Sequence, residues 1–165
     1  MNTRIGYGQV EPNHLSAQRT GQIYAQLPSA VDVLENGMFA KYDIENGQVN
    51  LTGDGEWLLV LNEVKLYDNL KESYKDFAMV KSAKLDVAPR LFKTNIGDIY
   101  TTNCVAANLI DDANTVIAAG TELYVGDDGY LTKTANEGMV WKVVKGSDKW
   151  TMPDGQPAIK VQRIK

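Results

Sequence analysis

Short apolar runs separated by Asn-Gly or Asp-Gly pairs form the main pattern of the chain from residue 28 onward. The five pairs are Asn36-Gly37, Asn46-Gly47, Asp54-Gly55, Asp128-Gly129 and Asp154-Gly155. A two-residue turn that fits the twist of paired strands needs positive φ at its central residues, which Gly, Asn and Asp tolerate best. The pattern therefore predicts a mainly β protein with antiparallel hairpins.

The apolar runs give the positions of the predicted strands. They lie near residues 31–34, 38–44, 48–52, 56–67, 91–94, 98–102, 139–144 and 158–164, with three further strands between 116 and 132. The run from residue 56 is continuously apolar at first and then alternates. This change predicts a strand buried on both faces that later covers only one. Trp57 at its start is expected to be a core residue.

One segment has helical spacing. Tyr67, Leu70, Tyr74 and Phe77 recur every three or four residues, which favours a short helix over a strand at 68–80. Residues 80–90 have two interpretations. They are either a boundary between two subdomains or a long connection within a single barrel.

Residues 1–28 differ from the rest of the chain. They contain four Gln, three Gly and two Pro, and their few apolar residues follow no sustained period. This composition predicts an extended arm that a partner holds in place, with an ordinary frayed terminus as the alternative.

The predicted fold class is therefore mainly β, an antiparallel small barrel or sandwich with a short helix and an extended N-terminal arm. Three segments are expected. They are the arm at 1–28, a β-rich subdomain with the possible helix at 29–88, and a small barrel-like subdomain at 89–165.

The composition agrees with a globular chain. Apolar residues make up 44% of the 165 residues and charged residues 23%. No apolar run approaches the roughly 20 residues of a membrane-spanning helix, and residues 1–8 do not resemble a signal peptide. We therefore expect no membrane partner, and a location in a cytoplasm or in something assembled there.

The charge is unevenly distributed along the chain. Residues 1–132 contain 10 basic and 18 acidic side chains, whereas residues 133–165 contain 7 basic and 3 acidic ones. The basic residues at the C-terminal end are spaced like the solvent face of strands, so we expect no nucleic-acid partner. The sharper alternative is that ends of opposite sign orient neighbouring copies, or a copy and an acidic partner.

Few residues suggest chemistry. The single His14 has no sequence neighbour to orient it as a base, and one His with one Cys cannot furnish the usual four ligands of zinc. Cys104 is expected to be a small buried residue. Asp127 and Asp128 fit a turn, with a weak calcium site left open. We predict no catalytic residue, no cofactor and no metal centre.

The last third of the chain carries a resemblance. Its residues 97–103, 119–123 and 126–131 form turn and strand motifs that resemble small β modules of bacteriophage virion proteins, especially capsid decoration, or head accessory, proteins. The resemblance implies a non-enzymatic virion protein that binds and stabilises a capsid lattice. Its partner would be the major capsid protein or another virion protein. The protein would form a homo-oligomer or occupy many lattice positions, and it would be located in the virion, which is assembled in the host cytoplasm.

Tyrosines and aliphatic residues supply the candidate contact residues, because tyrosine is enriched at interfaces, although it also suits strands. In the arm and in segment 120–131 the candidates are Tyr7, Ile23, Tyr24, Leu27, Tyr124 and Tyr130. The alternative function is a glycan- or peptide-binding module, such as part of a phage fibre, that uses Trp141 and Trp150. An enzyme working through carboxylates alone is the third class.

Overall fold

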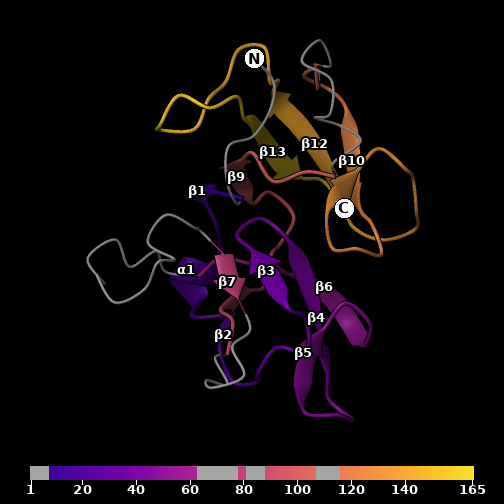
Figure 1. Ribbon diagram of the computed structural model, residues 1–165. Helices are drawn as coiled ribbons and strands as arrows, with labels where there is room; N and C mark the ends of the chain where they lie inside the picture. Colours follow the sequence, from indigo (N-terminus) through magenta and orange to yellow (C-terminus); the bar gives the residue numbers. More distant parts are fainter. Residues whose placement is uncertain (1–7, 63–77, 81–87, 107–115) are drawn as a thin grey trace.

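Figure 1 shows the computed structural model of the chain, which describes residues 8–62, 78–80, 88–106 and 116–165. These residues contain thirteen strands and one short helix. In chain order they are β1 (Val10–His14), α1 (Ala17–Thr20), β2 (Ile23–Tyr24), β3 (Val33–Glu35), β4 (Phe39–Asp43), β5 (Gln48–Asn50), β6 (Asp54–Val60), β7 (Ala78–Val80), β8 (Leu91–Phe92), β9 (Ile99–Thr102), β10 (Glu122–Val125), β11 (Leu131–Thr132), β12 (Val140–Lys145) and β13 (Ile159–Arg163).

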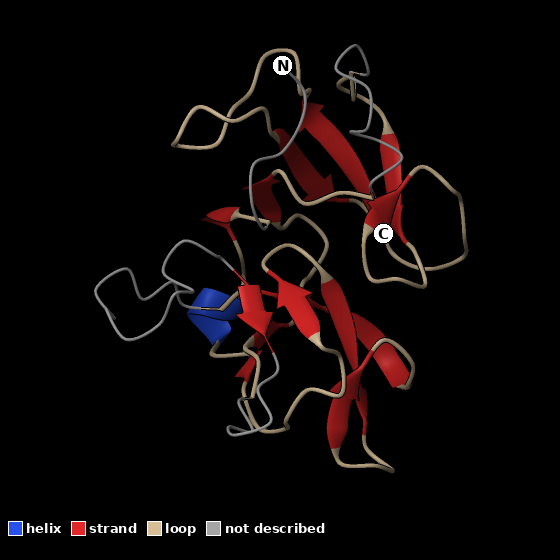
Figure 2. Cartoon of the chain, viewed as in Figure 1, coloured by secondary structure: helices blue, strands red, loops and turns tan. Residues whose placement is uncertain are grey.

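Two antiparallel sheets make up most of the fold (Figure 2). The six-stranded sheet has the order β1-β9-β13-β12-β10-β11, and the five-stranded sheet has the order β2-β8-β6-β4-β5. A third, two-stranded sheet pairs β3 with β7. The mainly β, sandwich-like fold class is confirmed. The barrel is not formed by the described strands, because β1 and β11 remain the two edges of the six-stranded sheet.

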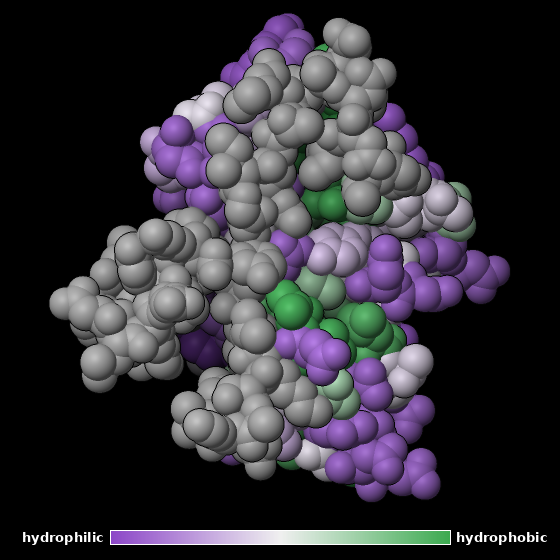
Figure 3. Space-filling model, in the orientation of Figure 1, coloured by the Kyte–Doolittle hydropathy of each residue, from purple (hydrophilic) through white to green (hydrophobic). Residues whose placement is uncertain are grey.

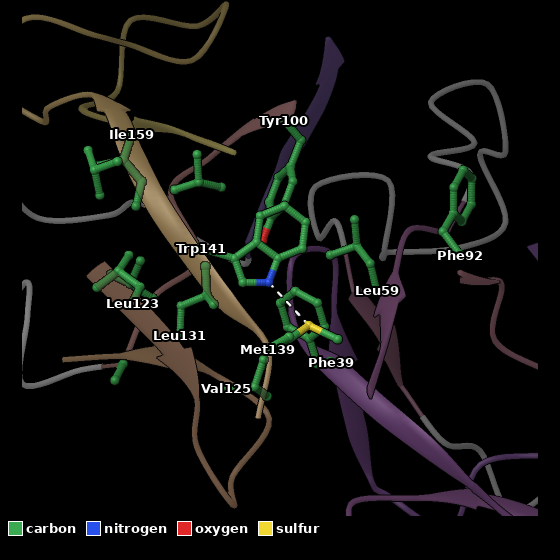
Figure 4. Packing of buried hydrophobic residues seen from close by; sticks show 14 of the residues in the cluster. Phe39, Leu59, Phe92, Tyr100, Leu123, Val125, Leu131, Met139, Trp141 and Ile159 are labelled. Carbon is green, nitrogen blue, oxygen red and sulfur yellow. Dashed lines mark hydrogen bonds between the residues drawn. The ribbon is translucent and has the colours of Figure 1, made fainter. Parts of the chain in front are cut away.

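The main core joins the two large sheets. Trp141 of β12 is fully buried, and its ring lies 5.9 Å from that of Phe39 in β4 and 5.1 Å from that of Tyr100 in β9, centroid to centroid. The indole nitrogen of Trp141 donates a hydrogen bond to the sulfur of Met139 at 3.2 Å (Figure 4). Tilted and edge-on ring pairs at these separations add to the gain from burial. Trp141 thus binds one sheet to the other.

A second core covers the opposite face of the five-stranded sheet. Successive residues of a strand point to opposite faces, and β6 ends in Leu58, Leu59 and Val60, all buried. Leu59 belongs to the main core, whereas its two neighbours belong to the second. The prediction of a strand buried on both faces is confirmed for this part of β6. Cys104, expected to be small and buried, is fully buried in the second core.

Residues 8–28 are built into the fold, which corrects the prediction of an arm held by a partner. β1 pairs with β9 and β2 pairs with β8, so the segment extends both large sheets. Residues 28–30 continue along the free edge of β5, where the amide of Val49 donates to the carbonyl of Pro28 at 2.8 Å. The chain's own strands therefore take the place that the prediction gave to a partner.

A buried carboxylate fixes the first part of this segment. Asp98, 2% exposed, accepts hydrogen bonds from the amide and the hydroxyl of Ser16 and from the amide of Asn95. Ser16 directly precedes α1, and Asn95 lies in the turn between β8 and β9. A buried carboxylate needs such donors to offset its lost hydration. Asp98 thereby ties α1 to the connection between the two sheets.

The predicted helix at 68–80 lies mostly outside the described residues. Its last three residues, 78–80, form the strand β7 and pair with β3, so the prediction is wrong there. The short helix that the structure does contain, α1, was not predicted. Its four residues are too few to show a helical period.

The five Gly-containing pairs all have a glycine with positive φ, but only some of them close hairpins. Asn46-Gly47 joins β4 to β5, and Asp128-Gly129 joins β10 to β11. Asp154-Gly155 closes a small turn bridged by Thr151 and Pro157. The pair at 36–37 instead connects strands of different sheets, and the pair at 54–55 lies within β6, where the register with β4 shifts.

The predicted division into three segments does not coincide with separable units. The five-stranded sheet takes β2 from the first segment, β4 to β6 from the second and β8 from the third. The main core likewise contains residues of all three segments, for example Leu15, Phe39 and Trp141. A cut at residue 28 or 88 would therefore remove strands from a shared sheet.

We predict that Trp141→Ala lowers the free energy of unfolding by about 3–5 kcal/mol, because it leaves a cavity where the two sheets meet. Urea titration followed by circular dichroism measures the change. Lys133→Ala, at an exposed loop position, serves as the control and should change stability by less than about 0.5 kcal/mol. A loss below about 1 kcal/mol for Trp141→Ala would show that this contact does not hold the sheets together.

We also predict that Tyr100→Phe is at least as stable as the wild type at pH 7 and loses stability less steeply at alkaline pH. The buried Tyr100 hydroxyl has no hydrogen-bond partner among the described residues, so its removal costs little. Burial, with a smaller contribution from Cys104, raises the pKa of Tyr100 well above its ordinary value.

The sign of the pH effect follows from proton binding. The unfolded chain releases the Tyr100 proton near pH 10, whereas the native protein keeps it, so native stability falls as pH rises above about 10. Urea titrations at several pH values between 7 and 11 measure this slope. Equal alkaline slopes for the wild type and Tyr100→Phe would contradict the prediction.

Candidate functional site

The candidate contact residues of the N-terminal segment serve the protein's own fold. Ile23 packs against the main core, and Tyr24 and Leu27 pack against the second core. The rings of Tyr24 and Tyr42 meet edge to face with centroids 6.1 Å apart. Tyr7 lies outside the described residues. The structure therefore does not gather these residues into one outward surface.

Tyr130 has an internal role as well. It packs against both cores, and its hydroxyl donates a hydrogen bond to the carboxylate of Glu35, which is 3% exposed. The other oxygen of Glu35 accepts from the amide of Gly8 at 3.2 Å. This buried carboxylate joins β3, the β10–β11 turn and the N-terminal segment. Sequence reasoning missed Glu35, because no local pattern marks a carboxylate whose partners lie 27 and 95 residues away.

Tyr124, on β10, is the candidate that lies on the outside of the six-stranded sheet. Its neighbours Leu123 and Val125 point into the main core, so the half-buried Tyr124 points the other way. Its hydroxyl donates to the carboxylate of Glu122 at 3.1 Å. This hydrogen bond, with smaller contributions from desolvation and from the charge of Glu122, raises the pKa of Tyr124.

The outer side of β12 and β13 is basic. On β12, Trp141 and Val143 are buried while Lys142 is exposed, and on β13, Ile159 and Val161 are buried on either side of the half-buried Lys160. The expectation that these lysines occupy the solvent face of strands is confirmed for Lys142, Lys145 and Lys160. We define the basic face as Lys142, Val144, Lys145, Trp150 and Lys160.

Trp150 lies on this face and contacts two of its neighbours there. Its indole nitrogen donates to the hydroxyl of Thr101 at 3.0 Å, and the ammonium nitrogen of Lys160 lies 4.6 Å from its ring centroid. Thr101 and Lys160 are directly paired across β9 and β13. Trp150 is therefore a half-buried part of the surface, whereas Trp141 is enclosed in the core.

The basic face contains an unfavourable arrangement of charges. A register irregularity in β12 places Lys145 directly opposite Lys160 of β13. Like charges at directly opposite strand positions destabilise a sheet. None of Lys142, Lys145 and Lys160 forms an ion pair with a carboxylate of the part of the chain that the structure describes. The ring of Trp150 offsets part of the repulsion for Lys160.

The β4–β5 hairpin carries the opposite charge. We define the acidic hairpin as Asp43, Ile44, Glu45 and Asp54, with Asp54 paired across from Tyr42. Ile44 is 74% exposed at the turn. Sequence reasoning missed this site, although the signal was an isoleucine between two carboxylates, placed just before an Asn-Gly turn.

Asp43 also shapes this turn. It accepts hydrogen bonds from the side chain of Asn46 at 2.8 Å, from the amide of Asn46 at 3.2 Å and from Gln48 at 3.3 Å. The side-chain bond from Asn46 is the largest cause of a lowered pKa at Asp43. The carboxylate is therefore charged at neutral pH while it holds the hairpin tip.

Asp127 and Asp128 occupy the β10–β11 turn, as predicted, and Asp128 accepts a hydrogen bond from the amide of Tyr130 at 3.1 Å. Both line an open surface depression together with Thr134 and Asn136. Across the described residues, no group of three or more His, Cys, Asp or Glu side chains is arranged to hold a metal ion. His14 is exposed at the end of the edge strand β1.

Comparisons with known proteins returned no match: no family model, no curated protein and no solved structure is similar to this chain. None of the helices among the described residues is long and apolar enough to cross a membrane.

We predict that Glu122→Gln lowers the pKa of Tyr124 toward its ordinary value, because the carboxylate accepts a hydrogen bond from the neutral phenol and repels the phenolate. Ultraviolet titration of the wild type and of Glu122→Gln, each compared with its own Tyr124→Phe partner, isolates this phenol. An unchanged titration of Tyr124 in Glu122→Gln would show that the contact is absent in solution.

Proposed function

We propose that this chain is a non-enzymatic virion structural protein that binds and stabilises a phage capsid lattice as a decoration or accessory head protein. The resemblance of residues 97–103, 119–123 and 126–131 to capsid decoration modules supports the identity of the partner, which would be the major capsid protein or another virion protein. The observation that carries the proposal is the outer side of the six-stranded sheet, where aromatic and basic side chains share a surface fixed by strands.

The geometry of this surface suits protein contact. Tyr124 and Glu122 both lie on β10, where Tyr124 presents a large ring. Lys142 of the neighbouring strand β12 lies directly opposite Glu122. Tyrosine contributes contact area at a low cost in side-chain entropy, and charged residues around it select the partner. Segment 120–131, expected from the sequence as a contact region, contributes Tyr124 to this surface.

The lattice would strengthen a modest contact. Copies held at neighbouring lattice positions, or joined to one another, bind with higher overall strength than one copy alone. The contact made by residues 8–28 is not part of this proposal, because those residues build the sheets. The binding surface would instead be ready before assembly.

The alternative function, a glycan- or peptide-binding module of a phage fibre, depends on exposed tryptophan. Trp141 does not serve it, since this side chain is fully buried. Trp150 remains, with Lys160 over its ring. Binding of the wild type to a glycan array, lost in Trp150→Ala, would favour this alternative over a capsid contact.

We predict that the wild type co-sediments with capsids assembled from the major capsid protein of the same phage, and that Tyr124→Ala and Lys142→Ala each lower its affinity by about tenfold. Lys133→Ala, at an exposed position away from this surface, should bind as the wild type does. Occupancy is measured by quantitative gel analysis of pelleted particles across a concentration series. Absence of the wild type from the pellet would overturn the proposed function.

A further inference from the structure

The two ends of the molecule differ in charge. In Figure 1 the end of β12 and the connection that leads to β13 lie at the top, while the β4–β5 hairpin forms the lower end. The top carries the basic face, and the lower end carries the acidic hairpin. Figure 3 shows that the lower end is hydrophilic. Among the described residues, the basic face and the acidic hairpin therefore lie at different ends of the molecule.

The basic face has a positive balance, although Glu122 of β10 lies directly opposite Lys142 and offsets part of its charge. Lys142, Lys145 and Lys160 form no ion pair with a carboxylate of the described residues, and the exposed Lys149 lies in the adjoining loop. Asp148 lies in the same loop and reduces the local charge by one. Because the opposed Lys145 and Lys160 repel each other, an incoming negative group would relieve repulsion that the isolated molecule retains.

The acidic hairpin likewise carries charges that have no ion-pair partner in the described residues. Asp43, Glu45 and Asp54 have no cationic partner in the described residues, whereas Glu56, further along β6, is engaged by Lys93 at 3.8 Å and by Arg163 at 3.7 Å. The carboxylates of the acidic hairpin are therefore free to meet a cation from outside the molecule. An incoming positive group would meet negative charge on this hairpin, where Asp43 also holds the turn.

Each end also has an exposed apolar side chain among its charges. Ile44 is 74% exposed in the acidic hairpin, and Val144 is 42% exposed on the basic face beside Lys145. An apolar centre surrounded by charged residues is typical of a specific contact, in which the apolar part is buried and the charges at its rim set orientation. The two ends are therefore opposite in charge, and each presents one exposed apolar side chain.

We propose that the basic face binds the acidic hairpin of a second copy of this chain, head to tail. Such a contact joins two different surfaces, so it leaves one free face and one free hairpin on each dimer and extends into a ring or an open chain. The inference goes beyond the proposed function, because it concerns the free protein and needs no capsid. It also makes this contact electrostatic, so that salt weakens it.

Sedimentation velocity of the full chain tests the proposal. We expect concentration-dependent association at about 20 mM salt and an apparent Kd at least about tenfold weaker at about 500 mM salt. The double variants Lys142→Glu with Lys145→Glu, and Glu45→Lys with Asp54→Lys, should each remain monomeric at concentrations where the wild type associates. Asp43 is left unchanged because it holds the hairpin turn.

Mixing the two double variants gives the decisive result. Each retains one wild-type surface, so an equal mixture restores the original contact and should associate although neither variant does alone. Lys133→Glu, a charge reversal at an exposed site outside both surfaces, should associate as the wild type does, and circular dichroism shows that each variant is folded. A wild type that stays monomeric at about 1 mM, or a mixture of folded variants that stays monomeric, overturns the proposal, whatever the outcome of capsid binding.

Discussion

The burial of Trp141 between Phe39 and Tyr100 is the contact on which the rest of the structure depends. These three rings belong to β12, β4 and β9, so the contact joins strands of both large sheets. Each sheet is an open array of short strands that needs an apolar face covered to be stable. The cluster around Trp141 provides that cover for both sheets at once.

The same contact determines what the outer side presents. With Trp141, Val143 and Val161 turned inward, alternation along β12 and β13 turns Lys142 and Lys160 outward. A slip of one residue would bury these lysines and expose the core side chains, and burying an unpaired ammonium group carries a large free-energy cost. The register of the basic face is therefore fixed by the core, and only the irregularity between Val143 and Lys145 adjusts it.

The sequence predicted those features that local patterns encode. Strands β4, β5, β12 and β13 coincide with short apolar or alternating runs, and the exposure of Lys142 results from that alternation. The pairing of strands was harder to predict from the sequence. Gly37 and Gly55 have the positive φ that their dipeptides predict, and yet they close no hairpin. A turn signal specifies a local backbone conformation, but it does not specify which strands pair.

The candidate site was predictable to a similar extent. Tyr124 and the lysines could be placed on strand surfaces by their own periodicity. The positions of Ile23 and Tyr24 could not be predicted in this way, because β2 pairs with β8, which lies far along the chain. An apolar residue in a segment without a period indicates that something covers it. The sequence alone does not distinguish a partner molecule from a distant strand of the same chain.

This distinction changes the energetics of the proposed binding. A disordered arm that folds on its partner loses conformational entropy at the moment of binding, which reduces the affinity obtained from each contact. Residues 8–28 have already been ordered by β9, β8 and Asp98 during folding of the chain itself. The outer side of the six-stranded sheet is preformed, and the electrostatic repulsion between Lys145 and Lys160 is present before any partner arrives. A partner therefore gains from relieving that repulsion without ordering the backbone beneath it, so charge complementarity and not folding sets the strength of the contact.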